Sequence, residues 1–368
     1  MRICVVAETA PRERRVALVP DSAAKLVKAG HEVVVQSGAG TAAYHDDASY
    51  VAAGATIAGD AGSAHVGAQV VCRVQRPNAD EVALIPEGAT LIAMMAPASA
   101  GPIVAALTAR KVSVLALELV PRITRAQSMD VLSSQATVAG YKAVLIGASM
   151  LPRFLPMLTT AAGSITPAKA FVIGAGVAGL QALATARRLG AVTSGFDVRA
   201  AAAEQVKSLG ATFVQSDVVS AAAEGTGGYA KAQSIDEAAQ TLATIARHIK
   251  DQDLVISTAA IPGRAAPRLI TAEMVHSMRA GSVIIDLAAE TGGNCELTQL
   301  GETVEVNGVM VVGAANLPAT MPTHASQMYS RNVLTLLQHL TKDGALVVDL
   351  NDEITGAMTL THEGQVRP

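Results

Sequence analysis

Residues 169–180 read Lys-Ala-Phe-Val-Ile-Gly-Ala-Gly-Val-Ala-Gly-Leu. The apolar run before the first glycine predicts a strand, and the Ala/Leu-rich residues that follow the last one predict a helix. Gly174 permits a tight turn, Gly176 lets the backbone approach a diphosphate, and Gly179 lets the helix pack closely on the strand. This spacing alone is a weak signal in a chain with 31 glycines. Set between a strand and a helix, it predicts a dinucleotide-binding loop.

The start of the predicted helix is the expected position of the diphosphate. Unpaired backbone N–H groups and the helix dipole favour negative charge there, so we expect contacts from Val177, Ala178 and Gly179. A second turn, Gly38-Ala-Gly40, lacks a third glycine at the matching place and is interpreted as an ordinary turn.

The next predicted strand, residues 191–196, ends at Asp197, which Val198 and Arg199 follow. An acid at this point, about 20 residues beyond the loop, accepts hydrogen bonds from the adenosine ribose hydroxyls. A carboxylate repels a 2′-phosphate, so NAD(H) is favoured over NADP(H). Arg199 complicates this prediction, because an arginine there can serve a phosphate instead. The simpler alternative is that Asp197 only ends a strand.

Strand-like and helix-like segments alternate along the whole chain, a pattern typical of parallel sheets with helices on both faces. The expected fold is α/β, with two doubly wound parallel-sheet (Rossmann-like) domains and a cleft between them. The first domain is expected to comprise residues 1–130 and 320–368. Its C-terminal part holds one predicted helix (326–340) and one predicted strand (346–350), which are too little for a third domain. Residues 131–319 form the expected NAD(H)-binding domain.

Composition excludes several functional classes. Half of the 368 residues are apolar but only 2% are aromatic, so the core must be aliphatic. With 28 basic and 31 acidic residues the formal charge is −3, and no basic block supports a nucleic-acid partner. Three scattered cysteines suit neither a disulfide framework nor a zinc site, and the histidines lack neighbouring ligands, so no metal site is expected.

Targeting and membrane signals are absent from the sequence. The N-terminal apolar run is too short for a signal peptide. The longest uncharged stretch, residues 88–109, is interrupted by Pro97, Ser99, Gly101 and Pro102. It predicts a strand, a turn and a helix, so we expect a soluble chain without direct membrane insertion.

Three further segments are candidates for the nucleotide site. Residues 223–231 place three glycines around Tyr229 and predict either a mobile flap, with Gly228 and Tyr229 at its tip, or a plain linker. The predicted strands 254–258 and 282–287 end near Ala260, Pro262 and Glu290, where open α/β sheets place their ligands, so the nicotinamide half is expected there. A polar group lies between residues 121 and 140 and predicts either a binding site or a solvated hinge; it includes Arg122, Gln127, Asp130 and Ser133.

From end to end the chain resembles the NAD(H)-binding domain I of the proton-translocating nicotinamide nucleotide transhydrogenases, within the alanine dehydrogenase-like superfamily. The matching motifs are residues 12–20, 30–33, 73–77, 121–130, 133–135, 139–141, 228–231 and 281–287. The resemblance implies that Arg122, Gln127, Asp130 and Ser133 line the nicotinamide and its ribose. It also implies that Asp197 contacts the adenosine ribose and that Tyr229 closes a flap over the nucleotide.

Alanine dehydrogenase is the alternative function within this superfamily. Amino-acid oxidation needs a positioned acid or base, because protons move as well as hydride. Alanine dehydrogenases carry a Lys-Val-Lys-Glu-Pro motif, but here residues 73–77 read Arg-Val-Gln-Arg-Pro, with the amide of Gln75 in place of a lysine. No histidine occurs between His65 and His248, and Glu290 stands where those enzymes have an aspartate. The role of Arg15 stays open, between holding a substrate carboxylate as in those enzymes and bracing the domain interface.

Hydride exchange between two nicotinamides needs proximity and orientation but no acid or base. The polar residues between 121 and 140 are therefore expected to act by position. One dinucleotide motif in the chain implies that NADP(H) is bound by a partner subunit. The resemblance further implies membrane-spanning subunits that move protons, a cytoplasmic location at the membrane through those subunits, and a homodimer. A non-catalytic NAD-binding regulatory subunit is a third possibility.

Overall fold

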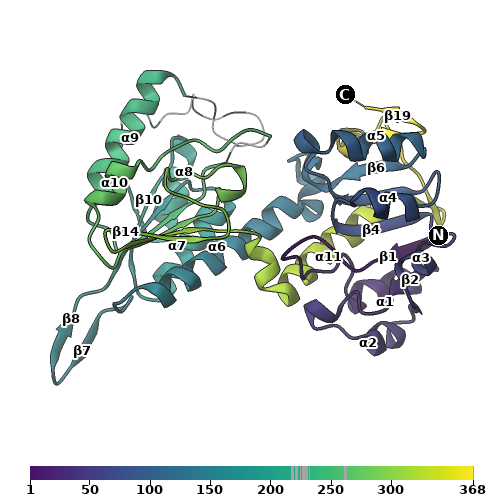
Figure 1. Ribbon diagram of the computed structural model, residues 1–368, viewed down its shortest axis with the longest axis horizontal. Coiled ribbons are helices and arrows are strands. Elements are labelled where there is room, and N and C mark those ends of the chain that lie inside the picture. Colours follow the sequence, from purple (N-terminus) through teal and green to yellow (C-terminus); the bar gives the residue numbers. More distant parts are fainter. Residues whose placement is uncertain are drawn as a thin grey trace. The chain divides into compact units, whose positions relative to one another are not determined.

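The computed structural model describes residues 1–216, 219, 223, 225, 231, 233–260 and 263–367. The chain divides into two compact units, each built around its own mainly parallel sheet (Figure 1). Unit 1 comprises residues 1–135 and 318–368, and unit 2 comprises residues 136–317. The expected fold class of two doubly wound parallel-sheet domains is confirmed. The expected limits were residues 130 and 319, whereas the division falls inside the helix Val131–Met150 and the 3₁₀ turn Leu317–Thr320.

Unit 1 has an eight-stranded sheet in the order β19-β18-β6-β5-β4-β1-β2-β3. Its strands are β1 (Arg2–Val5), β2 (Glu32–Gln36), β3 (Thr56–Ala58), β4 (Val70–Gln75), β5 (Thr90–Met94), β6 (Ser113–Ala116), β18 (Thr359–His362) and β19 (Gln365–Val366). Its α-helices are α1 (Pro20–Lys28), α2 (Asp47–Ala52), α3 (Ala61–His65), α4 (Ala79–Leu84), α5 (Gly101–Ala109), α11 (Pro322–Leu340) and α12 (Glu353–Met358). Helix α6 (Val131–Met150) begins in this unit. The first six strands are parallel, and β18 and β19 add antiparallel pairs at one edge.

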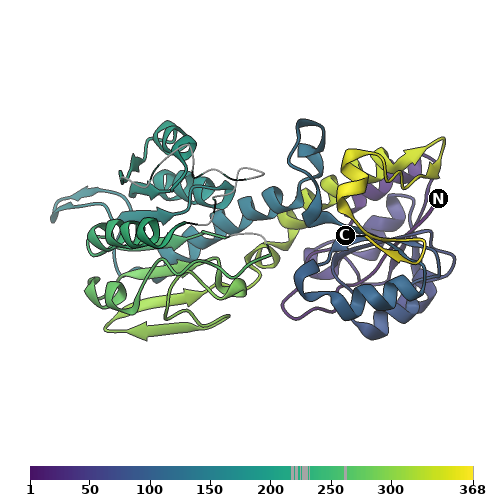
Figure 2. The same ribbon diagram turned by 90° about the horizontal axis from the view of Figure 1, so that it is seen from above.

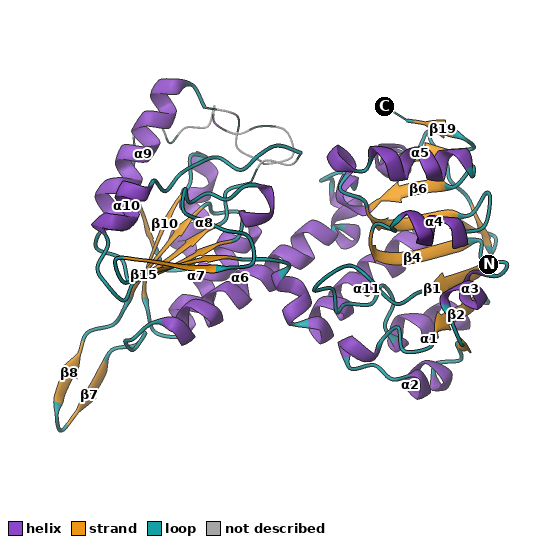
Figure 3. Cartoon of the chain, in the orientation of Figure 1, coloured by secondary structure: helices purple, strands orange, loops and turns teal. Residues whose placement is uncertain are grey.

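Continuous β-branched runs bury both faces of this sheet. Ile3, Val5 and Val35 pack in one apolar cluster with residues of α1, α2, α11 and α12. Cys4 and Val34, which alternate with them, pack in a second cluster with residues of α3, α4 and α5, the helices that cover the other face (Figure 3). The uncharged stretch 88–109 forms β5, a turn and α5, as expected.

The C-terminal segment packs within unit 1. Tyr329 and Val333 of α11 lie in the core beside β1, and β18 pairs with β6. The expected strand over residues 346–350 is wrong: only Leu346 belongs to a strand, the two-residue β17 (Ala345–Leu346), which pairs with β16 (Thr341–Lys342). Local turn hydrogen bonds override the β-propensity of that segment, because the Asp349 side chain accepts from the Asn351 N–H and Asp352 caps α12.

Unit 2 has a seven-stranded sheet in the order β11-β10-β9-β12-β13-β15-β14. Its strands are β9 (Lys169–Ile173), β10 (Val192–Phe196), β11 (Thr212–Phe213), β12 (Leu254–Ser257), β13 (Val283–Asp286), β14 (Thr303–Val306) and β15 (Val309–Gly313). Its further helices are α7 (Val177–Arg188), α8 (Ala200–Ser208), α9 (Ile235–Ile249) and α10 (Ala272–Ser277). All neighbouring strands are parallel except β14, which pairs antiparallel with β15.

Each sheet contains a point where the strand order reverses. In unit 1, β1 lies between β2 and β4; in unit 2, β9 lies between β10 and β12. The loops at the carboxyl ends of such central strands diverge to opposite faces of the sheet, which leaves a crevice where α/β proteins bind ligands. These two positions are therefore the places to look for a site.

A two-stranded hairpin projects from unit 2 (Figures 1 and 2). It consists of β7 (Leu158–Thr160) and β8 (Gly163–Ile165). Phe154 and Met157 lie before it, and Ile165 lies within it; their side chains are exposed. Within the part of the chain that the structure describes, every helix is too short or too polar to cross a lipid bilayer.

Candidate functional site

The loop after β9 has the geometry that its glycines predict. Gly174 has φ +92°, a left-handed conformation that favours glycine. A Cβ atom on Gly179 would lie 1.8 Å from the carbonyl oxygen of Gly174, so helix α7 approaches the end of β9 as closely as its backbone allows. A Cβ on Gly176 would meet no protein atom within 4 Å. The loop is thus closed on its inner side and open at Gly176.

Helix α7 begins at Val177 with no capping hydrogen bond from any described side chain. Its first N–H groups face the open side of the loop together with the positive end of the helix dipole. Thr258, just after β12, braces the loop from the neighbouring strand by donating to the carbonyl of Gly174 over 2.9 Å. Helix α6 packs against the same helix start, because a Cβ on Gly140 would lie 2.1 Å from the Ala178 carbonyl oxygen. A diphosphate fits this arrangement.

Asp197 lies directly beyond β10 and is buried, with 6% of its surface exposed. One carboxylate oxygen, Oδ2, accepts from the Ala175 N–H at 2.8 Å and from Arg199 Nη2 at 2.7 Å. The other, Oδ1, accepts from the N–H and the Nε of Arg199, both at 2.9 Å. The acid expected to hold a ribose is therefore fixed beside the loop and paired with Arg199. Val198 is half-buried against the core of the unit.

Two buried polar side chains hold the loops at the ends of β12 and β13. Asp286 accepts from the backbone N–H of Ala288 and Cys295 and from the hydroxyls of Ser257 and Thr298. Asn294 donates to the carbonyl oxygens of Ala259 and Pro267, both at 2.8 Å, and accepts from the Ala259 N–H. These bonds fix the backbone that leads to Ala260, whose side chain is exposed.

Glu290 is exposed in a 3₁₀ turn (Ala289–Thr291) beyond β13, and its Oε1 accepts from the Asn316 N–H at 2.8 Å. Ala260 and Glu290 thus follow neighbouring parallel strands, β12 and β13. Pro262, Gly228 and Tyr229 lie outside the described residues.

The predicted polar group of unit 1 surrounds the start of α6. Asp130 accepts from the Ser133 N–H at 2.9 Å and from its hydroxyl at 2.6 Å, which is the bonding of a helix N-cap. Gln127 belongs to a 3₁₀ segment (Thr124–Met129), and the side chains of Gln127 and Arg122 are exposed. The structure therefore brings Asp130 and Ser133 into direct contact and leaves Arg122 and Gln127 facing solvent within this unit.

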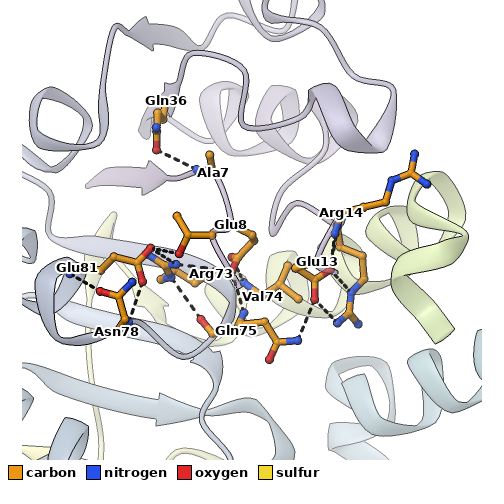
Figure 4. A network of polar contacts seen from close by, with 12 residues as sticks. Ala7, Glu8, Glu13, Arg14, Gln36, Arg73, Val74, Gln75, Asn78 and Glu81 are labelled. Atoms are coloured by element: carbon orange, nitrogen blue, oxygen red, sulfur yellow. Dashed lines mark hydrogen bonds and ion pairs between the residues drawn. The ribbon is translucent and has the colours of Figure 1, made fainter. Parts of the chain in front are cut away.

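The crevice at the reversal point of unit 1 is filled by charged side chains of its own (Figure 4). Glu8, just after β1, accepts from the N–H groups of Val74 and Gln75 on β4 at 2.5 and 3.2 Å. Arg73 Nη2 lies 3.7 Å from Glu8 Oε2 and 2.7 Å from Glu81 Oε1. Burial raises the pKa of Glu8 to about 7, against the opposing effect of the Arg73 charge and the two backbone bonds.

Glu13, Arg15, Gln75 and Gln135 continue this network. Arg15 donates from Nε and Nη2 to the two oxygens of Glu13 at 2.8 and 2.7 Å, and from Nη1 to Gln135 at 2.8 Å. The Gln75 amide donates to Glu13 over 2.8 Å. Although burial opposes ionisation, hydrogen bonds and charge from Arg15 outweigh it and lower the pKa of Glu13 to about 2. Arg15 and Gln75 thus share one partner, Glu13, and Arg15 is held entirely within unit 1.

Sequence reasoning did not assign roles to Asp286, Asn294, Glu8 or Glu13. A signal existed for the two aspartates alike, because Asp286, like Asp197, directly follows a predicted apolar strand. Glu8 also follows a strand, but its partner Arg73 is far away in sequence, and only the order of β1 and β4 brings them together.

A parallel sheet ending in this Gly-rich loop, with an uncapped helix start and a buried acid after the next strand, defines an α/β protein of the dinucleotide-binding class. The particular family follows from comparison with known sequences. The model of the alanine dehydrogenase/PNT C-terminal domain matches residues 143–368, and that of the N-terminal domain matches residues 4–139. The chain belongs to the alanine dehydrogenase/PNT family.

Transhydrogenase subunits resemble the chain more strongly than alanine dehydrogenases do. The first of the chains that make up the NAD(P) transhydrogenase subunit alpha of Rhodospirillum rubrum is 47% identical over 100% of this chain and 97% of its own length. The crystal structure of transhydrogenase from Sinorhizobium meliloti has a TM-score of 0.90 at 45% identity, with 100% of both chains covered. An alanine dehydrogenase of Halomonas elongata is 30% identical over 100% of this chain and 94% of its own length. The expected resemblance to transhydrogenases is confirmed, and alanine dehydrogenase is the more distant relative.

Proposed function

We propose that this chain binds NAD(H) at the Gly-rich loop of unit 2 and exchanges hydride with NADP(H) held by a partner subunit. The observation that carries the proposal is the junction of β9 and β10, where Gly176 is open, the start of α7 is uncapped, and Asp197 lies beside the Ala175 N–H. Bound NADH supplies a hydride from its nicotinamide ring. The transhydrogenase names of the relatives support this reaction.

The residues of the chain act by binding and orientation. Gly174, Gly176, Val177, Ala178 and Gly179 hold the diphosphate through backbone N–H groups and the helix dipole. Asp197, with Val198 and Arg199, holds the adenosine end, and the carboxylate disfavours a 2′-phosphate. Ala260, Pro262 and Glu290 lie toward the nicotinamide, on loops that Asp286 and Asn294 fix in place. Gly228 and Tyr229 cover the bound nucleotide.

The polar group of unit 1 completes this proposal. Arg122, Gln127, Asp130 and Ser133 contact the nicotinamide and its ribose and supply no proton. The capping bonds between Asp130 and Ser133 support a fixed geometry for both side chains. Exposure of Arg122 and Gln127 leaves their polar groups accessible to a ligand. Hydride transfer between two nicotinamides then depends on the distance and orientation of the rings.

The partners follow from the same assignment. NADP(H) binding and proton movement belong to other subunits, some of them membrane-spanning, and this chain is held at the cytoplasmic face of the membrane through them. The word "subunit" in the names of the relatives supports such an assembly. We also propose a homodimer, which the projecting β7–β8 hairpin supports, because Phe154, Met157 and Ile165 leave apolar surface exposed there.

The decisive experiment mixes the purified chain with the NADP(H)-binding domain of a related transhydrogenase. NADPH bound to that domain should reduce an NAD analogue bound to this chain, and the analogue's absorbance reports the transfer. Transfer supports the proposal. NADH binding without any transfer would instead indicate a regulatory subunit, and reduction of pyruvate with ammonia by the chain alone would indicate an alanine dehydrogenase.

A further inference from the structure

The carboxylate of Asp197 has no acceptor capacity left for a ligand. An ionised carboxylate offers about four acceptor positions, two on each oxygen. Oδ1 accepts from the N–H and the Nε of Arg199, and Oδ2 accepts from the N–H of Ala175 and the Nη2 of Arg199. A ribose diol that binds an acid bidentately needs an acceptor position on each oxygen. The site as it stands therefore cannot receive the diol.

The four bonds differ in how readily they can be released. The Ala175 N–H belongs to the Gly-rich loop and the Arg199 N–H to the turn before α8, so both are fixed by the backbone. The two bonds from the Arg199 side chain depend on a rotatable stem, and 18% of that side chain is exposed. These two bonds, one on each oxygen, occupy the number of positions that a diol requires.

We propose that the Arg199 side chain is a latch on the ribose-binding acid and a determinant of the choice between NADH and NADPH. The proposal rests on the NAD(H) site described above. When NADH binds, the guanidinium leaves Asp197 and the two ribose hydroxyls take its place on Oδ1 and Oδ2. In the absence of nucleotide, the guanidinium keeps the buried carboxylate paired, which an isolated buried charge requires.

The latch has opposite consequences for the two nucleotides. NADH must displace the guanidinium, so Arg199 competes with the diol and weakens NADH binding. NADPH carries a 2′-phosphate, which the positive guanidinium attracts and which the bare carboxylate repels. Arg199 therefore reduces the preference for NADH that Asp197 alone would give. Removing the guanidinium should sharpen the discrimination between the two nucleotides.

Arg199→Met tests this consequence, because methionine keeps the backbone N–H bond to Asp197 and part of the apolar stem. Binding is followed by the fluorescence of the reduced nicotinamide, in a chain that contains no tryptophan to interfere. The ratio of the NADPH to the NADH dissociation constant should rise by about tenfold, the effect of one hydrogen bond to a charged group. An unchanged or smaller ratio overturns the latch.

Arg188→Met is the matched control. Arg188 is exposed in the last turn of α7, at the end of the helix opposite to the Gly-rich loop. Its replacement removes the same charge from the same unit, and the NADPH to NADH ratio should stay at the wild-type value. An equal rise in both variants would show a general charge effect and would also overturn the proposal.

A second measurement does not depend on a variant that folds. The Nε–H proton of Arg199 in the full wild-type chain should be protected from exchange without nucleotide and should lose protection or shift on adding 5′-AMP. 5′-AMP carries the adenosine ribose but no nicotinamide. If NADH and 5′-AMP bind while this resonance stays unchanged, the latch is wrong and the NAD(H) site stands. If the wild-type chain binds neither nucleotide, the proposed function itself fails, and the latch with it.

Discussion

Glu13 and Arg15 form a buried bidentate ion pair, in which 0% of the Glu13 side chain and 2% of the Arg15 side chain are exposed. The pair lies at the crevice of unit 1, where β1 and β4 diverge, and the Gln75 amide bonds to the same carboxylate. A carboxylate of the chain thus already occupies the guanidinium of Arg15. This arrangement gives Arg15 a structural role within unit 1.

Arg15→Met should destabilise the chain by about 3–5 kcal/mol, because it leaves the carboxylate of Glu13 buried without its ionic partner. Chemical denaturation followed by circular dichroism measures the change. Arg14→Met is the control: Arg14 bonds to the exposed hydroxyl of Tyr44, and its loss should cost less than about 1 kcal/mol. A loss of stability as small for Arg15→Met as for this control would contradict the structural role.

Glu8 should make stability fall as the pH rises. Burial raises its pKa to about 7 from 4.5, so between these values the folded chain holds more protons at this position than the unfolded chain does. Stability from Glu8 is therefore greatest below about pH 4.5 and declines up to about pH 7. Glu8→Gln removes this dependence. The stability of Glu8→Gln relative to wild type should increase by about 2–3 kcal/mol between the two limits, at about 1.4 kcal/mol per pKa unit.

Urea denaturation at several pH values measures this difference, and Glu32→Gln controls for the loss of one carboxylate. Glu32 is exposed in an ion pair with Arg2, so its variant should follow the wild type over the same range. If the difference between Glu8→Gln and wild type does not change with pH, Glu8 does not titrate there.

The two glycines of the loop should separate folding from binding. In Gly179→Ala the added methyl group would lie 1.8 Å from the Gly174 carbonyl, so the helix must move, and we expect a loss of stability of about 3 kcal/mol. In Gly176→Ala the methyl group meets no protein atom, so stability should change by no more than about 1 kcal/mol. NADH affinity should nevertheless fall by at least about tenfold, because the methyl group projects where the diphosphate approaches.

Thermal unfolding and NADH fluorescence titration of both variants test this separation. Normal NADH affinity in Gly176→Ala would place the diphosphate elsewhere. Normal stability in Gly179→Ala would contradict the close approach of α7 to the loop.

Local pattern predicted much of the fold, because strands buried on both faces appear as continuous apolar runs and Gly-rich turns separate them from helices. The loop at residues 174–179 was predictable in detail, since its conformation depends on neighbouring glycines. The pairing of Glu8 with Arg73 was not predictable, because it depends on which strands become neighbours. The strand expected at 346–350 failed because turn bonds from Asp349 and Asp352 outweigh the propensity of two valines.

Gln75→Lys should not create an alanine dehydrogenase. The new ammonium would lie beside Glu13, whose carboxylate Arg15 already binds, so the lysine would be held in an ion pair rather than facing a substrate. Oxidation of NADH with pyruvate and ammonia should remain at background in both wild type and variant. Turnover in the wild type would remove the main argument against that activity, and turnover in the variant alone would show that Gln75 is what prevents it.

Asp130 offers the sharpest test of the polar group in unit 1, because its two suggested roles respond differently to substitution. As the N-cap of α6, it needs only an oxygen that accepts from Ser133, and asparagine caps helices as well as aspartate does. Asp130→Asn should therefore keep the wild-type stability, whereas Asp130→Ala should lose about 1 kcal/mol. If the charge also acts on the nicotinamide end of bound NADH, both variants should slow hydride transfer to a similar extent in the assay with the NADP(H)-binding domain. A normal rate in Asp130→Asn would limit this residue to capping.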